Sequence, residues 1–294
     1  MLPGRLGLET ARIPHADRHG LLWLYRGNLT VKNGTLQFTT AGYKELESGV
    51  YAIPFQTVSV IMLGPGCTVS HDALRILARH NTGLIAIGEG GVRYYASMPF
   101  GPDESRLARK QVMAWAEVTG RKIDIVRRMY AWRLGEIFPA ENIEVLRGME
   151  GARVKTMYKR ISEQYDVPWH GRRYDRSNPN SADLPNQAIN HAASAVEGAA
   201  MIAVAATGTI PQLGFIHEDS GISFCLDIAD LFRDEITVPV AFKAVTKFKE
   251  QRNQSLESIT RRLAGRAMHE KQVIPNMIDR IKKLFEDTPT KKSY

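Results

Sequence analysis

Glu150 is a carboxylate on an otherwise apolar stripe of the predicted helix 142–165. The other members of that stripe are Ile143, Leu146, Val154, Met157 and Ile161. Burying an unpaired carboxylate is unfavourable, so this position requires a cationic side chain, a metal ion or a raised pKa. Taken alone, the pattern favours an ion pair with Arg147 or Arg153.

A histidine and several aspartates follow each other closely later in the chain. His217 ends the strand-like segment 213–216, and Asp230 lies on a predicted helix over residues 223–234. Asp227, Asp230 and Asp234 are spaced i, i+3 and i+7, which places them on one helical face. An imidazole beside carboxylates suits Mg²⁺ or Mn²⁺. Acidic faces are also common as solvated surfaces, so the spacing alone leaves both interpretations open.

The charges are unevenly distributed along the 294 residues. Lys and Arg number 39 against 31 Asp and Glu, a formal net charge of +8. Residues 106–176 and 241–294 form two basic blocks, each with a net charge of +7, and residues 177–240 between them have a net charge of −7. Basic blocks indicate an anionic partner such as nucleic acid. Carboxylates beside such blocks suit metal-dependent phosphoryl transfer.

Composition excludes several classes of protein. With 44% hydrophobic and 24% charged residues, the chain is neither disordered nor collagen-like. Two cysteines cannot form a disulfide framework or a four-thiolate zinc site. The most apolar stretch, residues 198–208, is too short to span a bilayer, so we expect a cytoplasmic protein without a membrane partner.

Strand and helix signals predict an α+β protein with two domains. Residues 1–101 are expected to form a β-rich, sandwich-like domain, and residues 102–294 a larger α-helical domain, with the breaker cluster 99–103 at the boundary. Asn33-Gly34 predicts a hairpin turn, and Ser70 is expected to cap a short helix. The predicted strands are 21–25, 29–31, 36–39, 51–53, 58–63, 84–87 and 92–96. The predicted helices are 71–80, 104–118, 121–134, 142–165, 187–207, 223–234, 239–250, 256–269 and 274–285.

Three blocks in order, residues 146–153, 214–217 and 224–230, resemble the signatures of the CRISPR spacer-acquisition integrases (Cas one). The similarity is greatest to the subtype I-E form, and segments 61–71, 88–97 and 169–175 add to it. The resemblance implies an N-terminal β domain, a C-terminal α domain, and Glu150, His217 and Asp230 as ligands of Mg²⁺ or Mn²⁺. It also implies that Asp227 is a further acidic residue of the catalytic site.

The resemblance also implies an activity and partners. In this family a DNA 3′-hydroxyl attacks a phosphodiester of the CRISPR repeat, and metal-dependent endonuclease activity accompanies it. Double-stranded DNA (protospacer and repeat-leader), a second Cas adaptation protein and a homodimeric arrangement are the implied partners. The residues expected to bind DNA are Tyr25, at a fork or protospacer motif, and Arg75, Arg93, Arg147, Arg172 and Arg173.

Two other functions fit the same residues. The chain could be a non-catalytic DNA-binding scaffold whose acidic residues only balance charge. It could also be a metal-dependent hydrolase of small phosphates, which would turn over substrate without a polynucleotide. One departure from the family pattern bears on DNA contacts, because Glu218 and Asp219 follow His217 where relatives have a basic residue nearby.

Overall fold

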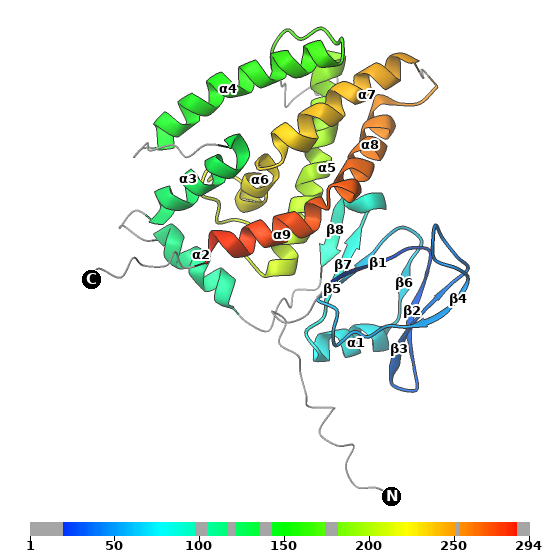
Figure 1. Ribbon diagram of the computed structural model, residues 1–294. Helices are drawn as coiled ribbons and strands as arrows, with labels where there is room; N and C mark the ends of the chain where they lie inside the picture. Colours follow the sequence, from blue (N-terminus) through cyan, green and yellow to red (C-terminus); the bar gives the residue numbers. More distant parts are fainter. Residues whose placement is uncertain are drawn as a thin grey trace, which may run out of the picture. The chain divides into compact units, whose positions relative to one another are not determined.

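The computed structural model describes residues 20–97, 105–116, 121–135, 143–173, 182–250 and 253–286. Strands come first along the chain and helices follow (Figure 1). The predicted α+β class, a β-rich N-terminal part followed by a larger helical part, is therefore confirmed. The predicted domain boundary and its breaker cluster, residues 99–103, lie outside the described residues.

The described residues divide into two compact units. The first holds residues 20–89, 94–97 and 105 together with Ala205–Gly208. The second holds Gly90–Arg93 and the remaining described residues from 106 onward. Each unit is considered by itself below, and the residues with predicted catalytic roles all belong to the second.

Two four-stranded sheets form the first unit. One sheet has the order β1 (Leu21–Leu24), β5 (Val60–Leu63), β7 (Gly83–Ile87) and β8 (Tyr94–Ser97). Strands β1, β5 and β7 pair in parallel, and β7 and β8 pair antiparallel. The other has the order β4 (Gly49–Ala52), β3 (Thr35–Thr40), β2 (Gly27–Lys32) and β6 (Thr68–Val69). Asn33 and Gly34 have φ values of 51° and 77°, as a tight β2–β3 hairpin requires, so the predicted turn is confirmed.

Helix α1 (His71–Arg79) closes the core of the first unit. The Ser70 side chain accepts a hydrogen bond from the Ala73 amide at 3.2 Å, which confirms the predicted cap. Ala73 and Leu77 are buried with apolar side chains of both sheets, namely Leu24, Leu29, Leu36, Phe38, Ile61, Leu63 and Leu84. The two sheets therefore share one core, as the sandwich-like prediction requires.

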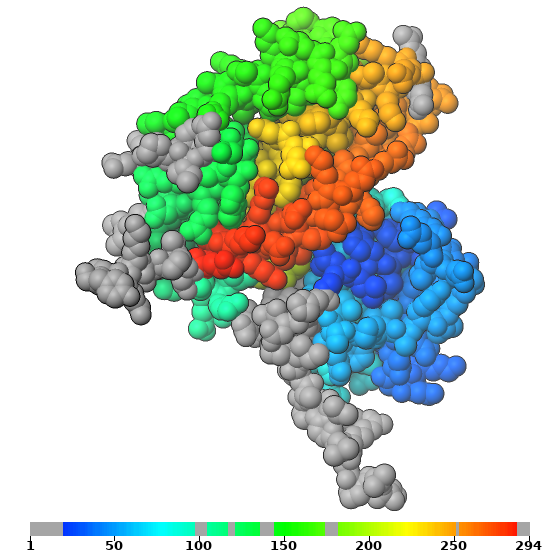
Figure 2. Space-filling view, in the orientation of Figure 1, coloured from blue at the N-terminus to red at the C-terminus, as the bar shows by residue number. Residues whose placement is uncertain are grey.

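The second unit is helical. Its helices are α2 (Arg106–Ala116), α3 (Arg121–Leu134), α4 (Ile143–Gln164), α5 (Leu184–Thr207), α6 (Ser223–Asp230), α7 (Val238–Glu250), α8 (Leu256–Glu270) and α9 (Val273–Leu284). Figure 2 shows α4 in green, α7 and α8 in yellow to orange and α9 in red on the visible face of this unit. Helix α5 instead contributes a run of buried alanine, valine and isoleucine side chains to the interior.

The small residues of α5 permit close packing. A Cβ added at Gly198 would lie 3.1 Å from backbone atoms of Val92 and Arg93, so a larger residue here would force that backbone to shift by a few tenths of an ångström. By length and composition alone α5 could cross a membrane, but 61% of the relevant 18-residue window is buried inside the fold. This burial is typical of a core helix in a globular protein.

The predicted helix 223–234 is wrong in one respect that matters for the site. Helix α6 ends at Asp230, and a π-helical turn, η4 (Arg233–Thr237), begins three residues later. Asp227, Asp230 and Asp234 therefore do not lie on one continuous helical face. Predicted strand 92–96 also begins later, at Tyr94, because the 3₁₀ turn η2 (Glu89–Gly91) precedes it.

Candidate active site

Glu150 is held by two side chains of α3. Its Oε1 accepts a hydrogen bond from Nη1 of Arg133 at 2.5 Å, and its Oε2 accepts one from the Tyr130 hydroxyl at 3.1 Å. The Glu150 side chain is 21% exposed and that of Arg133 only 4%. Burial and the neighbouring charge of Glu150 raise the pKa of Tyr130, so the phenol stays protonated and donates.

The expected partners of Glu150 are therefore wrong. Arg147 pairs with Glu144 at 3.1 Å and donates to the backbone carbonyl of Ile216 at 2.8 Å. Arg153 donates to a backbone carbonyl at the end of α3. Both arginines are near Glu150 in sequence, but the cation that neutralises Glu150 comes from a different helix.

Asp227 organises the segment that carries His217. Its Oδ2 accepts from the amides of Phe215 and Ile216 at 2.6 and 3.1 Å, and its Oδ1 accepts from the His217 amide at 2.9 Å. The same Oδ1 lies 2.7 Å from Nδ1 of His217. Asp227 is fully buried, and all of these contacts are with one loop. Both carboxylate oxygens of Asp227 therefore hold the segment that carries His217.

The imidazole of His217 is oriented by this contact. Because Asp227 is an acceptor, Nδ1 donates to it and the lone pair of Nε2 points away from it. Nε2 lies 4.0 Å from Oδ2 of Asp230. The hydrogen bond to Asp227 raises the pKa of His217, opposed by burial and assisted by Asp230. The imidazole side chain remains 38% exposed.

Asp230 lies between two arginines. Its Oδ1 is 3.1 Å from Nη1 of Arg233, and its Oδ2 is 3.8 Å from Nη1 of Arg133. Arg133 also approaches Asp234, with 3.5 Å between Nε and Oδ1. Burial raises the pKa of Asp234 against the opposing charge of Arg133. Arg133 therefore contacts carboxylates from three separate elements.

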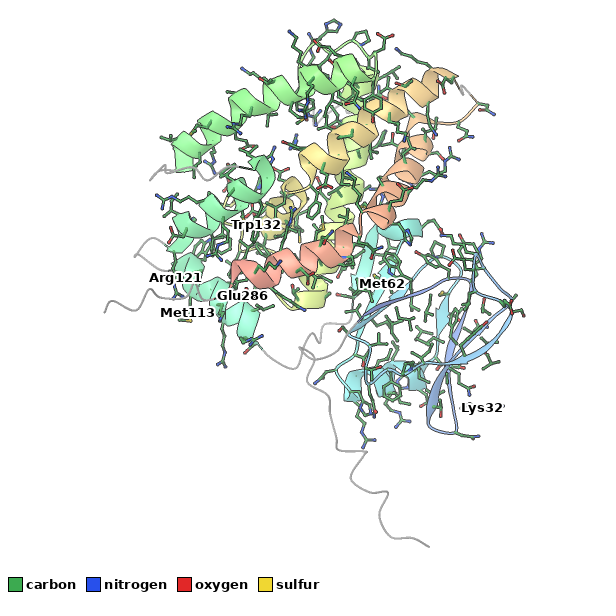
Figure 3. The ribbon with its side chains drawn as sticks, viewed as in Figure 1. Lys32, Met62, Met113, Arg121, Trp132 and Glu286 are labelled. Carbon is green, nitrogen blue, oxygen red and sulfur yellow. The ribbon has the colours of Figure 1, made fainter. Side chains whose placement is uncertain are left out.

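The structure thus brings the three predicted ligands to one place. Arg133 contacts both Glu150 and Asp230, and Nε2 of His217 lies 4.0 Å from Oδ2 of Asp230, so the three side chains are linked through Arg133 and Asp230. Trp132, labelled in Figure 3, precedes Arg133 and marks this end of α3. These side chains offer oxygen and nitrogen donors of the types that bind divalent cations.

Tyr25 belongs to an aromatic and basic cluster in the first unit. Its ring is 6.4 Å from Trp23 in a stacked arrangement and 5.6 Å from Tyr43. Nζ of Lys44 is 5.1 Å from the Tyr25 ring, and the guanidinium of Arg26 is 4.6 Å from the Tyr43 ring. Rings flanked by cations are suited to stacking on nucleobases.

Arg75 and Arg93, predicted to bind DNA, lie in different units. Arg75 is exposed on α1 and pairs with Asp72 at 3.2 Å, a contact that DNA phosphates can replace. Arg93 belongs to the second unit and lies 3.7 Å from Glu257 of α8. The structure does not bring these two residues together within one unit.

Arg172 and Arg173 differ in their local partners. The guanidinium of Arg172 donates to Oδ1 of Asn186 at 3.0 Å and to Oδ1 of Asn190 at 2.6 Å. Arg173 donates its backbone amide to Asn186 at 2.9 Å, and its side chain is exposed. Asn186 is fully buried and anchors this segment to α5. Arg173 is therefore the better placed of the two to reach a phosphate.

The comparisons with known proteins decide the family. Residues 122–260 match the family model described as CRISPR associated protein Cas1. A CRISPR-associated endonuclease Cas1 of Methanospirillum hungatei is 35% identical over 267 residues, which is 90% of this chain and 87% of that protein. The chain belongs to the Cas1 family.

Other Cas1 proteins extend this similarity. The CRISPR-associated endonuclease Cas1 of Escherichia coli K12 is 38% identical over 234 residues, which is 79% of this chain and 74% of the relative. The solved TtCas1–DNA complex has 32% identity and a TM-score of 0.82, covering 92% of this chain and 98% of that one. A casposase bound to its integration product shares the fold, with 16% identity and a TM-score of 0.64. The subtype I-E assignment stays a prediction.

Cas1 membership raises the question whether the site fits a divalent cation. The 4.0 Å between Nε2 of His217 and Oδ2 of Asp230 falls within the spacing of two ligands on one ion, about 3.0–4.2 Å for metal–ligand bonds of about 2.1 Å. An added Cβ at Gly148 or Gly151, which flank Glu150, would meet nothing within 4 Å. The types of donor atom at this site therefore fit a divalent cation.

The present arrangement of these Cas1 side chains is nevertheless not a formed metal centre. Among the residues that the structure describes, no three His, Cys, Asp or Glu side chains are grouped so that they could hold an ion. Glu150 is instead bonded to Arg133. His217 and Asp230 have the donor types and the spacing that suit a divalent cation. Glu150 would have to leave Arg133 to join them.

Sequence reasoning missed the residues that support the Cas1 site. Tyr130 and Arg133 are spaced i, i+3 on α3, so one face of that helix carries a hydroxyl and a guanidinium side by side. A polar pair on the buried side of an amphipathic helix is the signal that could have revealed them. Gln111 of α2 gave no such signal, since a single glutamine is common on exposed helical faces.

Gln111 joins α2 to the segment that precedes His217. Its side-chain amide donates to the carbonyls of Ile210 and Leu213 at 3.0 and 2.9 Å, and its oxygen accepts from the Ile210 amide at 2.7 Å. Gln111 is fully buried. These three hydrogen bonds fix the turn that precedes the loop carrying His217.

Gln111→Leu is expected to destabilise the protein by about 2 kcal/mol, because it leaves backbone groups of Ile210 and Leu213 without their partner. We expect the midpoint of thermal unfolding to fall by roughly 4–8 °C. Val112→Ala, at an exposed neighbour on the same helix, is the matched control and should change it little. Equal melting temperatures for both variants would contradict the anchoring role.

Proposed function

We propose that this chain is a metal-dependent DNA strand transferase and endonuclease that inserts new spacers into a CRISPR array. Its relatives are named CRISPR-associated endonucleases. The observation that carries the proposal is that Glu150 and Asp230 share Arg133 as a partner while Nε2 of His217 lies 4.0 Å from Oδ2 of Asp230. We further propose that the protein acts in the cytoplasm in antiviral defence.

The residues of the chain have distinct roles in this proposal. A divalent cation, Mg²⁺ or Mn²⁺, bound by Glu150, His217 and Asp230 would supply Lewis acidity toward a DNA phosphate. Asp227 holds the imidazole so that Nε2 faces Asp230. The Tyr130 hydroxyl holds one oxygen of Glu150 and thereby orients the other.

Arg233 completes this set of positioning contacts. It binds Oδ1 of Asp230 at 3.1 Å and leaves Oδ2 facing His217. The Tyr158 hydroxyl lies 3.5 Å from Nη2 of Arg233, and the ring of Tyr158 stacks on Trp169 with centroids 4.7 Å apart. This series of contacts holds the partly buried Arg233 beside the carboxylate that it orients.

DNA is the proposed substrate, as protospacer and as the repeat-leader duplex. The net charge of +8 and the two basic blocks support binding to phosphates, with an affinity that falls as salt rises. The TtCas1 structure, 32% identical, is itself a DNA complex. We propose in addition that the chain acts as a homodimer together with a second Cas adaptation protein, as family membership implies.

A non-catalytic DNA-binding scaffold is the second candidate function. One observation favours it, since Arg133 and Arg233 pair with carboxylates at the site. A scaffold would need its acidic residues balanced in this way. The two candidates differ in whether a covalent DNA product forms.

The deciding experiment supplies the full chain and its partner protein with labelled duplex ends. With Mn²⁺ or Mg²⁺ we expect a DNA strand ending in a 3′-hydroxyl to be joined to a repeat-containing duplex. Strand transfer forms a new phosphodiester with that hydroxyl and breaks one in the repeat strand, which leaves with a free 3′-hydroxyl. A 3′-deoxy end should therefore give no joined product. Chelation by EDTA should also abolish joining, and added Mn²⁺ should restore it.

Each alternative gives a different result in the same assay. A scaffold would retain the labelled duplex on a filter under all conditions and yield no joined or cut DNA. A small-phosphate hydrolase would release nitrophenol from p-nitrophenyl phosphate at a rate independent of DNA. Joining of the 3′-deoxy end at the rate of the hydroxyl end would contradict the proposed chemistry.

A further inference from the structure

Arg133 is a buried cation at the point where the proposed metal ligands meet. Its side chain is 4% exposed, and its contacts reach Glu150 on α4, Asp230 at the end of α6 and Asp234 in η4. Burying a guanidinium is unfavourable unless carboxylates neutralise it. Arg133 therefore belongs to this acidic site and not to a solvent-exposed face of α3.

The hydrogen bonds of Arg133 are incomplete. It makes one short bond, to Oε1 of Glu150, whereas a structural Arg–carboxylate pair commonly uses two parallel bonds. Its Nε and the Oδ1 of Asp234 lie 3.5 Å apart, and both are buried atoms without a hydrogen-bond partner in the described structure. The guanidinium is thus held mainly by charge. Turning toward Asp234 would break only its hydrogen bond to Glu150.

Arg133 and a divalent cation would compete for the same oxygens. Nη1 of Arg133 contacts Oε1 of Glu150 and lies 3.8 Å from Oδ2 of Asp230, the atoms directed toward the proposed ion. Two cations at this spacing in a poorly solvated site repel each other strongly. Arg233 differs, because it holds the opposite oxygen of Asp230 and leaves Oδ2 accessible.

We propose that Arg133 is an internal counter-ion that neutralises the site before metal binding and must leave Glu150 for the ion to bind. Asp234 is the acceptor to which the guanidinium turns. The consequence is a lower affinity for divalent cations than the ligand set alone would give, together with a folded site in the absence of metal. This inference rests on the proposed metal-dependent function.

The test measures Mn²⁺ binding to the metal-stripped full-length protein by titration calorimetry. Arg133→Gln removes the competing charge but keeps a side chain of similar length. We expect it to bind Mn²⁺ roughly 10-fold or more tightly than the wild-type protein does, because one like charge is gone. Arg127→Gln, on the same helix and paired with Asp124 at 3.1 Å, is the matched control and should leave the affinity unchanged.

Thermal unfolding gives a second readout that does not depend on activity. In EDTA we expect Arg133→Gln to melt below the wild-type protein, because Glu150, Asp230 and Asp234 lose their shared counter-ion. Saturating Mn²⁺ should raise the melting temperature of this variant more than that of the wild type. Arg133→Lys keeps the charge and the fold, so its Mn²⁺ affinity should stay within about threefold of wild type.

The outcomes separate the two proposals. If the wild type binds Mn²⁺ and Arg133→Gln binds it equally or more weakly, Arg133 is not a competitor and this inference is overturned while the metal site stands. If the wild type, Arg133→Gln and Arg133→Lys all fail to bind Mn²⁺, the proposed metal site is wrong, and the inference is overturned with it. Should Arg133→Gln not fold, Asp234→Asn supplies the test, because it removes the acceptor to which the guanidinium turns. Weaker Mn²⁺ binding than wild type would support the inference, and unchanged or tighter binding would overturn it.

Discussion

His217→Ala is expected to reduce strand transfer at least about 100-fold, while duplex DNA binding changes less than about twofold. The imidazole is the nitrogen donor of the proposed site, with Nε2 4.0 Å from Asp230. Loss of an outer partner of a metal ligand already costs about 10–100-fold in many enzymes, so loss of the ligand itself should cost at least the upper value. The measurement is a gel assay of joined DNA beside a filter-binding titration.

The control for this prediction is His269→Ala. His269 is exposed in the last turn of α8, and its side chain makes no contact with the site residues described above. Its strand transfer should match the wild type. A clean His217→Ala preparation that joins DNA at the wild-type rate would show that the imidazole does not belong to the catalytic site.

Asp227→Asn is expected to combine a large loss of activity with a loss of stability. The carboxylate accepts from the amides of Phe215, Ile216 and His217 and from the His217 ring. An asparagine can present its oxygen to only one side, so its NH₂ group faces donors on the other. We expect a destabilisation of about 3 kcal/mol, a melting temperature lower by roughly 6–12 °C, and strand transfer lower by about 10–100-fold.

A double variant shows whether Asp227 acts through His217. If it does, Asp227→Asn in the His217→Ala background should lower stability further but leave the residual activity unchanged. Asp279→Asn, an exposed substitution of the same type on α9, controls for the change of charge. Strand transfer by Asp227→Asn equal to wild type at a temperature where both are folded would contradict the positioning role.

Features encoded over a few residues were predicted well. Asn33-Gly34 tolerates positive φ and so determines a hairpin wherever strands flank it, and Ser70 can cap α1 through a contact three residues away. Glu150 was recognised because helical periodicity places it on the stripe of buried Leu146, Met157 and Ile161. In each case the interaction or the period lies within one element.

The partners of the site residues were not predicted in the same way. The cation beside Glu150 was expected from its own helix, yet Arg133 lies 17 positions earlier on α3. The acidic stripe 227–234 failed because α6 ends at Asp230 and a π-turn follows, so Asp234 lies beside Arg133, whereas Asp227, inside α6, binds the His217 loop. The spacing of side chains within a helix does not report where that helix ends.

The sequence by itself determined the two-part architecture and the residue types at the site, because strand and helix periods, turn residues and the ordered blocks around Glu150, His217 and Asp230 are local properties of the chain. Only the tertiary structure decided which atoms of those residues are held and which are directed outward. That choice depends on contacts between residues of separate elements, such as Tyr130 with Glu150 and Arg133 with Asp234. Such contacts follow from helix packing, which the spacing within any one helix does not specify.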